Sequence, residues 1–125
     1  MMITVDISQS PRVADELQVV TLPLVIEVRP DPETQRLLAD LSPDTPWSDR
    51  QAAARELGRL GGPEALSGLL VALPTDPFWM VRCAMIQALE RIGDPGAIPT
   101  LREVADSDTF PIVRSHAVKA IERLS

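Results

Sequence analysis

The sequence predicts an all-α protein built from about three stacked two-helix repeats. Three observations support this: segments that align at a constant offset of 32 residues, apolar residues spaced for helical faces, and a near absence of aromatic residues. Apolar residues make up 45% of the 125 residues and aromatic residues only 3%, so the core must consist of aliphatic side chains, as in helix-on-helix packing. A chain of this length is expected to form one domain.

The three copies occupy residues 44–75, 76–107 and 108–125, and we expect the last to hold a first helix only. Their shared columns contain an acidic residue, a basic residue and an aliphatic residue. These are Asp44, Asp76 and Asp108; Arg50, Arg82 and Arg114; and Leu57, Leu89 and Ile121. So many matches at one offset indicate an internal repeat.

The first helix of each copy is predicted over 46–60, 78–92 and 110–124, where apolar residues recur at helical spacing. Gly61 and Gly93 stand directly after the first two of these helices. A helix C-cap often needs a residue with positive φ, so both glycines indicate helix ends.

The second helix is predicted over 63–73 and 95–105. Pro63 and Pro95 fall at its first position, where a missing N–H costs little. A preceding half-repeat is expected over 31–43, because its leucines lie 32 residues before those of the next copy. The repeat array is therefore predicted to run from this half-repeat to the last residue.

Residues 1–30 do not repeat. Apolar residues alternate over 3–7 and again over 22–28, which indicates two short strands, and Pro23 would place its strand at an edge. We interpret this segment as a β-hairpin or irregular cap over the first helices of the array at 31–125. Its open edge accepting a partner strand is the alternative.

The repeats resemble the HEAT-repeat family, in particular the short type found in phycobilisome (bilin) lyase subunits and many small bacterial proteins. The resemblance covers roughly 44–125. The family's Val-Arg start of the first helix is kept in two copies and replaced by Asp-Arg in the other: Val81-Arg82, Val113-Arg114 and Asp49-Arg50. The resemblance implies a right-handed α-solenoid whose second helices line the concave side, where a partner is usually held.

On that concave side we expect the second-helix residues Glu64, Ser67, Val71, Thr100 and Glu103 to be available to a partner. This set is small, mixed and slightly acidic. It suits a peptide or a helix better than DNA, which requires a basic surface.

The four aromatic residues form a second candidate contact site. Trp47 and Trp79 share one column, and Phe78 and Phe110 share the next, so all four should gather where the first helices begin. One interpretation buries them beneath the turns between repeats. The other exposes them as an aromatic ridge that contacts a partner.

The repeated aspartate and arginine resemble a ladder common in HEAT repeats. An arginine fork can bond the carboxylate of its own or a neighbouring repeat and also free carbonyls. Because the pair occurs in every copy, whereas a catalytic residue is needed once, we expect a structural role.

No catalytic or metal site is predicted, and no cofactor. Cys83, the lone cysteine, cannot form an internal disulfide, fits a reducing cytoplasm and is expected to be partly exposed and unreactive. His116 has no second histidine or cysteine pair to complete a metal site. The carboxylates at repeat boundaries are explained as helix N-caps: Asp76, Asp94, Asp106 and Asp108.

The final helix, 110–124, is predicted to have one inward face and one face that nothing in the array covers. The inward residues are Ile112, Val113, Ala117, Ile121 and Leu124. Those on the uncovered side are His116, Lys119, Glu122 and Arg123. That side is either solvated or a docking surface for a second copy, giving a homodimer, or for another partner.

The net charge of −6 disfavours sequence-independent nucleic-acid binding and attraction to anionic lipid. No apolar run approaches the roughly 18 residues of a membrane span, and no secretory signal is expected. The predicted function is a non-enzymatic cytoplasmic scaffold or adaptor that binds a protein. The alternative is an accessory or chaperone-like subunit of a bilin (tetrapyrrole) lyase, and a HEAT-like nucleic-acid-binding protein is less favoured.

Overall fold

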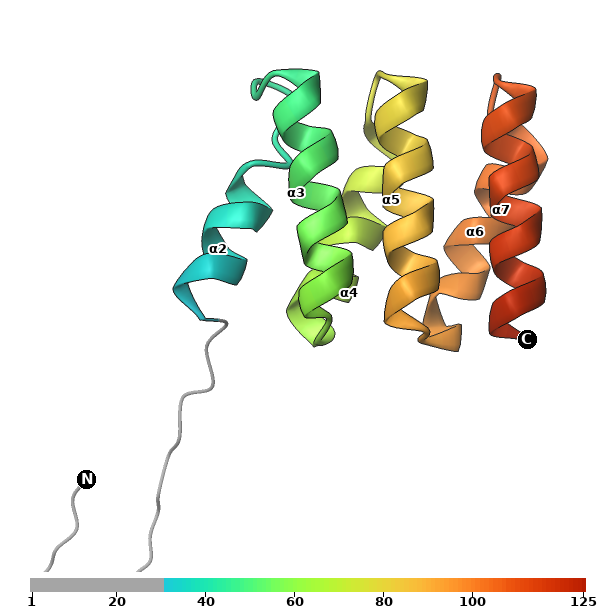
Figure 1. The fold of residues 1–125 in the computed structure, drawn as a ribbon. Coiled ribbons are helices and arrows are strands. Elements are labelled where there is room, and N and C mark those ends of the chain that lie inside the picture. Colours follow the sequence, from blue (N-terminus) through green and yellow to red (C-terminus); the bar gives the residue numbers. More distant parts are fainter. Residues whose placement is uncertain (1–30) are drawn as a thin grey trace, which may run out of the picture.

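The computed structural model describes residues 31–125, which form a stacked array of helices in two layers (Figure 1). The first layer contains the first helices of the copies: α3 (Trp47–Leu60), α5 (Trp79–Ile92) and α7 (Pro111–Leu124). The second layer contains α2 (Pro32–Ala39), α4 (Pro63–Ala72) and α6 (Ile98–Ser107). The described part of the chain is an all-α solenoid without strands. The cap predicted for residues 1–30 lies outside it.

Helix α5 is the centre of the array, because it packs against α3 on one side and α7 on the other. Eight of its fourteen residues are buried. Met85, Ile86 and Leu89 are fully buried among them. The position of Leu89 confirms the register predicted from the 32-residue offset.

The ends of the first helices follow the sequence closely. Each begins one residue later than predicted. Gly61 and Gly93 follow the helices with φ of 70° and 81°, values that favour glycine over other residues. Their amides donate to the carbonyls of Leu57 and Leu89, which closes both helices at the predicted C-caps.

The second helices depart from the prediction. Helix α4 ends at Ala72 and continues as a 3₁₀ turn over Leu73–Thr75. In the next copy a 3₁₀ turn over Pro95–Ala97 precedes α6, which extends to Ser107. Pro99 explains the difference, because its nitrogen has no hydrogen to donate to the carbonyl four residues earlier, so the first turn is not α-helical.

The first helices approach each other closely between α3 and α5. Gly58 faces Ala88, and a Cβ added to Gly58 would lie 2.8 Å from the Ala88 Cα. Glycine is disfavoured inside a helix, so here packing between helices overrides local helix propensity.

The structure of α7 differs from the prediction in two respects. Val113 and Ala117 are buried as expected, but Ile112 is 49% exposed. Its column lies on the outer surface of the first helices, where the equivalent residues Ser48 and Met80 are exposed or half-buried.

The four polar residues of α7 also do not share its uncovered side. His116, Lys119 and Arg123 lie toward α5, where they border one shallow depression with Glu90. Arg123 forms an ion pair with Glu90 across the two helices. The prediction is therefore wrong for these three residues, because their helical positions turn them toward α5.

Candidate functional site

An arginine–aspartate ladder joins successive copies. Arg50 donates from Nε to Oδ2 of Asp76 at 2.8 Å and from Nη2 to Oδ1 at 3.3 Å. Arg82 repeats this contact with Asp108 at 2.7 and 3.0 Å. Each arginine therefore bonds the aspartate of the following copy through a two-point fork.

The same groups also tie down the turns between helices. Arg82 donates from Nη1 to the carbonyl of Asp76 at 2.8 Å. The Asp76 and Asp108 carboxylates accept the backbone N–H of Phe78 and Phe110, both at 2.9 Å. Because these side chains are already bonded to the scaffold, the ladder has the structural role that the sequence predicts.

The electrostatics of Asp108 follow from this pairing. Burial by itself would raise the pKa of Asp108. Hydrogen bonds from Arg82 and the Phe110 amide, with the charges of Arg82 and Arg114, outweigh burial and lower that pKa below its ordinary value. The carboxylate is thus held ionised as a partner for arginine.

The aromatic residues form a continuous row across three copies. Trp47 meets Phe78 edge-on with ring centroids 4.9 Å apart, and Phe78 meets Trp79 at 6.3 Å. Trp79 stacks on Phe110 at 5.8 Å, and the Arg82 guanidinium lies 5.8 Å from the Phe110 ring centroid. The sequence correctly predicts that these four residues gather where the first helices begin.

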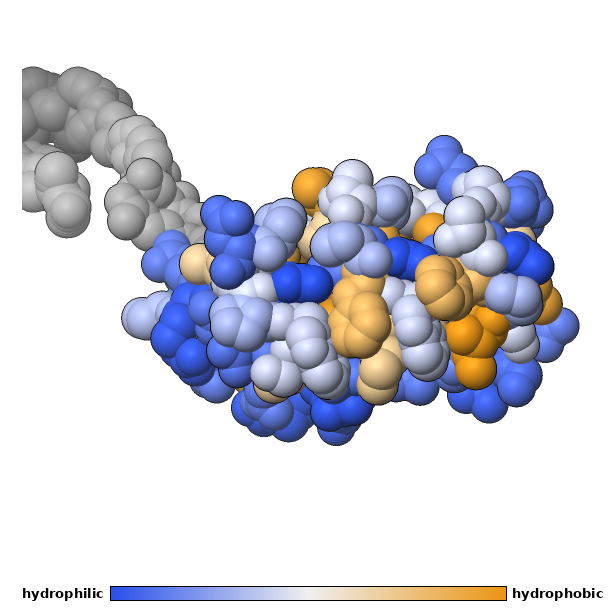
Figure 2. All heavy atoms as spheres, turned by 90° about the horizontal axis from the view of Figure 1, so that it is seen from above, coloured by the Kyte–Doolittle hydropathy of each residue, from blue (hydrophilic) through white to orange (hydrophobic). Residues whose placement is uncertain are grey.

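The row is half-buried in its middle and more exposed at its ends. Phe78 and Trp79 are half-buried, whereas Trp47 and Phe110 are 45% and 41% exposed. Figure 2 looks onto this edge and shows orange apolar groups with pale residues between them and blue hydrophilic residues around them. The row is therefore neither fully buried beneath the turns nor fully exposed as a ridge.

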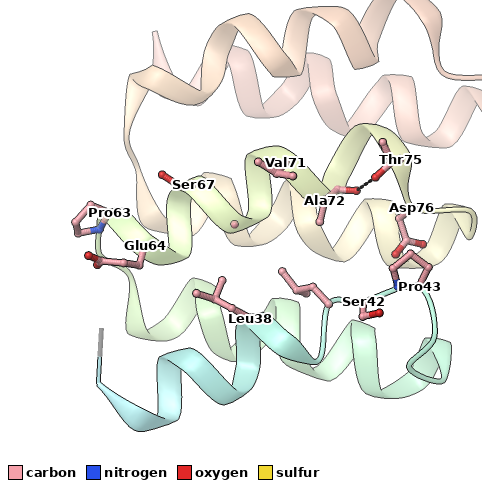
Figure 3. Close-up of a pocket in the computed structure, with 12 residues that line it drawn as sticks. Leu38, Ser42, Pro43, Pro63, Glu64, Ser67, Val71, Ala72, Thr75 and Asp76 are labelled. Atoms are coloured by element: carbon pink, nitrogen blue, oxygen red, sulfur yellow. Dashed lines mark hydrogen bonds between the residues drawn. The ribbon is translucent and has the colours of Figure 1, made fainter. Parts of the chain in front are cut away.

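A groove in the surface lies between α2 and α4. It has a volume of about 660 Å³, and Figure 3 shows its walls. One wall comes from α2 and the loop after it, and the other from α4. The lining residues are Leu38, Leu41, Ser42, Pro43, Pro63, Glu64, Ser67, Gly68, Val71, Ala72, Thr75 and Asp76.

The groove is mainly apolar and open to solvent. Val71 is 75% exposed, the highest value among the exposed large apolar residues of the described part of the chain. The two helices meet where Leu38 packs over Gly68, since a Cβ on Gly68 would lie 2.2 Å from the Leu38 Cδ2. A larger residue at Gly68 would displace the leucine that forms the opposite wall.

Among residues 31–125, the only ionisable groups that line the groove are Glu64 and Asp76. The Asp76 carboxylate is 2% exposed and already bonded to Arg50. Glu64 is half-buried and in no ion pair within residues 31–125. The groove thus presents apolar walls with one unpaired negative charge at one end, near Pro63 (Figure 3).

The structure separates the predicted second-helix residues into two groups. Glu64, Ser67 and Val71 line the groove together. Thr100 and Glu103 lie on α6, and Glu103 borders a separate depression of about 300 Å³. The sequence analysis did not predict Leu38 and Pro43 as groove residues. The leucines that the half-repeat shares with the next copy could have indicated that the half-repeat packs beside that copy.

The structure also differs from the predicted exposure of Cys83 and from the predicted helix N-caps. Cys83 is 9% exposed rather than partly exposed, because α5 is covered by α3 and α7. Burial raises the pKa of this thiol despite the opposing charge of Arg82, which agrees with an unreactive cysteine. Asp106 lies inside α6 and caps no helix, whereas Asp94 accepts the Gly96 amide as a cap. Asp76 and Asp108 are not N-caps either, because Phe78 and Phe110 occupy the N-cap positions of α5 and α7 and the two carboxylates bond arginines instead.

Residues 31–125 contain no group of three or more His, Cys, Asp or Glu side chains placed to hold a metal ion. Over the same residues, no helix combines the length and the apolar character that crossing a bilayer requires.

Comparison with known proteins identifies the repeat. A family model described as HEAT repeats matches residues 34–122, which include all or most of each helix from α2 to α7. Comparisons with curated proteins and with solved structures found no match. The repeat columns, the stacked helix pairs and this match together show that the chain belongs to the HEAT-repeat family.

Proposed function

We propose that this protein is a non-enzymatic interaction module that holds a segment of a partner protein in the groove between α2 and α4. HEAT repeats commonly mediate protein–protein interaction, and the fold is typically a non-catalytic scaffold. The observation that supports this location is the 75% exposure of Val71 in the α4 wall of an apolar groove. Exposed apolar surface of this kind is typical of binding sites.

The groove favours a particular type of segment. A short helix or an extended peptide could place an apolar side chain between Leu38 and Val71. A lysine or arginine on the same segment would then face Glu64, the unpaired carboxylate of the groove. None of the lining residues is basic, which together with the net charge of −6 supports a protein partner over a nucleic acid.

The bilin-lyase alternative receives less support. The groove offers one free ionisable side chain, Glu64, because Asp76 is already bonded to Arg50. The accessory-subunit role rests on the family resemblance, and no group lining the groove among residues 31–125 specifically favours a pigment. We therefore propose binding rather than catalysis.

Two finer features belong to the same proposal. We propose that the exposed ends of the aromatic row, Trp47 and Phe110, give a secondary contact, and that α7 supports self-association. We also propose a cytoplasmic location, because the lone cysteine fits a reducing compartment.

The test is affinity capture with matched variants. The Val71→Glu variant places a charge on the apolar α4 wall and should lose most of the captured partner. Ala52→Glu adds the same charge at an exposed position of α3, away from the groove, and should capture as the unmodified protein does. A circular dichroism spectrum and melting curve of each variant show that both remain folded.

The outcomes separate the candidate surfaces. Loss with Val71→Glu and with Glu64→Arg supports the groove. If capture survives both changes but is lost with Trp47→Ala and Phe110→Ala, the aromatic row is the contact surface and the groove is not.

A further inference from the structure

The outward face of α7 lacks the cover that the equivalent faces of the other first helices have. Val118 is 45% exposed, whereas Ile86 and Ala54, which lie 32 and 64 residues earlier in the same column, are fully buried. The difference arises because the next first helix covers α3 and α5, and nothing in the described part of the chain follows α7.

Charged residues on both sides of Val118 also belong to this face. Arg82 reaches outward to Asp108 of the next copy, so the equivalent Arg114 is directed away from α5. Arg114 donates from Nη1 to the carbonyl of Asp108, and its Nε and Nη2 bond no group in residues 31–125.

Glu122 is the second charged residue. Its equivalent, Glu90, pairs with Arg123 on the following first helix. Glu122 is exposed and forms no ion pair within residues 31–125. The face around Val118 therefore has an apolar centre, an unsatisfied positive charge at one end and an unsatisfied negative charge at the other.

We propose that a second copy of this chain covers this face, with the two α7 helices antiparallel about a two-fold axis at Val118. The proposal rests on the self-association through α7 proposed above and gives its register. Arg114 and Glu122 lie four residues before and after Val118, so an antiparallel pair places each Arg114 opposite Glu122 of the second copy. The two valines meet at the axis, and the interface is self-complementary.

Head-to-tail stacking of copies is the competing arrangement, and the other end of the array opposes it. Glu33 is exposed in the column where Ala65 is fully buried, and Asp49 is exposed where Val81 is fully buried. A copy stacked onto α2 and α3 would bury both carboxylates at positions that are apolar in the other copies, which is unfavourable unless a cation accompanies each of them. This end has the polar outer face typical of a capped repeat array.

The interface is built mainly from one helix pair, so it falls among small, reversible interfaces. Sedimentation velocity of the full chain, from micromolar to near-millimolar concentration, should show a monomer–dimer equilibrium without larger species. Glu122→Arg should weaken the dimer by roughly tenfold to thirtyfold, because two attractive pairs become repulsive. Arg114→Glu should act in the same direction.

Charge exchange tests the register directly. Glu122→Arg alone and Arg114→Glu alone are each repulsive, but an equimolar mixture should form a heterodimer in which both pairs are attractive. The double variant Arg114→Glu with Glu122→Arg should also recover the dimer. The two positions are about 12 Å apart along one helix, so the recovery cannot come from contact within a chain.

Controls and contrary results complete the test. Lys119→Glu changes the charge as Arg114→Glu does, but on the side toward α5, and should leave dimerisation unchanged. A monomer at every concentration overturns both self-association and its register. A dimer that ignores the charge changes overturns the register alone, and growth beyond a dimer indicates head-to-tail stacking instead.

Discussion

At the scale of single residues, each junction between copies depends on one arginine and one aspartate. Arg50 and Asp76 are nearly inaccessible, with side chains 6% and 2% exposed, and their fork is supplemented by bonds to backbone groups. Removing one member of such a pair leaves the other charged and buried, which costs more than the pair itself contributes. Surface pairs differ, because solvent screens them.

This contrast gives a prediction for Asp76→Ala. The change leaves Arg50 without its carboxylate and removes the acceptor for the Phe78 amide, so the free energy of unfolding should fall by about 3–5 kcal/mol. Glu56→Ala removes the partner of Arg59 in an exposed pair that solvent screens, and it should cost far less than Asp76→Ala. Urea unfolding followed by circular dichroism measures both, and equal losses would contradict the structural role of the ladder.

Residue identity also shows how far the sequence could predict the site. Glu64, Ser67 and Val71 were predicted because helical spacing places them off the core. Leu38 was not predicted as a groove residue, because the gap between α2 and α4 depends on the path of the chain between them, which spacing within one helix cannot reveal. The exposure of Trp47 and Phe110 likewise depends on neighbouring copies.

At the scale of helices, the 32-residue offset predicted every helix from α2 to α7 but not all of their ends. The first helices matched because Gly61 and Gly93 act locally as caps. The start of α6 did not match, because Pro99 prevents an α-helical first turn. The prediction was also wrong about which side of α7 is uncovered. Contacts with α5 determine that side, and the polarity of the α7 residues does not reveal it.

Two helical glycines allow a test of packing between helices. Gly58→Ala should destabilise the protein, although alanine is the better helix former by about 1 kcal/mol, because the new Cβ would meet the Ala88 backbone. Gly68→Ala should be close to neutral, since its Cβ meets only the end of the flexible Leu38 side chain. Thermal unfolding of both variants checks this, and a Gly58→Ala protein more stable than wild type would show that α3 and α5 are not so close.

At the scale of the whole molecule, stability should arise from contacts between neighbouring copies, as in other repeat proteins. Helix α5 contacts both other first helices, so damage at its centre should affect the entire array. Leu89→Ala should cost about 2–5 kcal/mol, because the fully buried side chain leaves a cavity. Leu124→Ala, at a half-buried position near the end, should cost clearly less in the same unfolding measurement.

The central claim is that the array holds a protein segment in the groove between α2 and α4, and site-specific photo-crosslinking tests it most directly. A photoreactive amino acid is introduced at Val71, at Ala52 or at Phe110, one position per variant. Cells that produce each variant are then irradiated. The account predicts a discrete covalent adduct with another protein from Val71 and no such adduct from Ala52. An adduct from Phe110 without one from Val71 would contradict it.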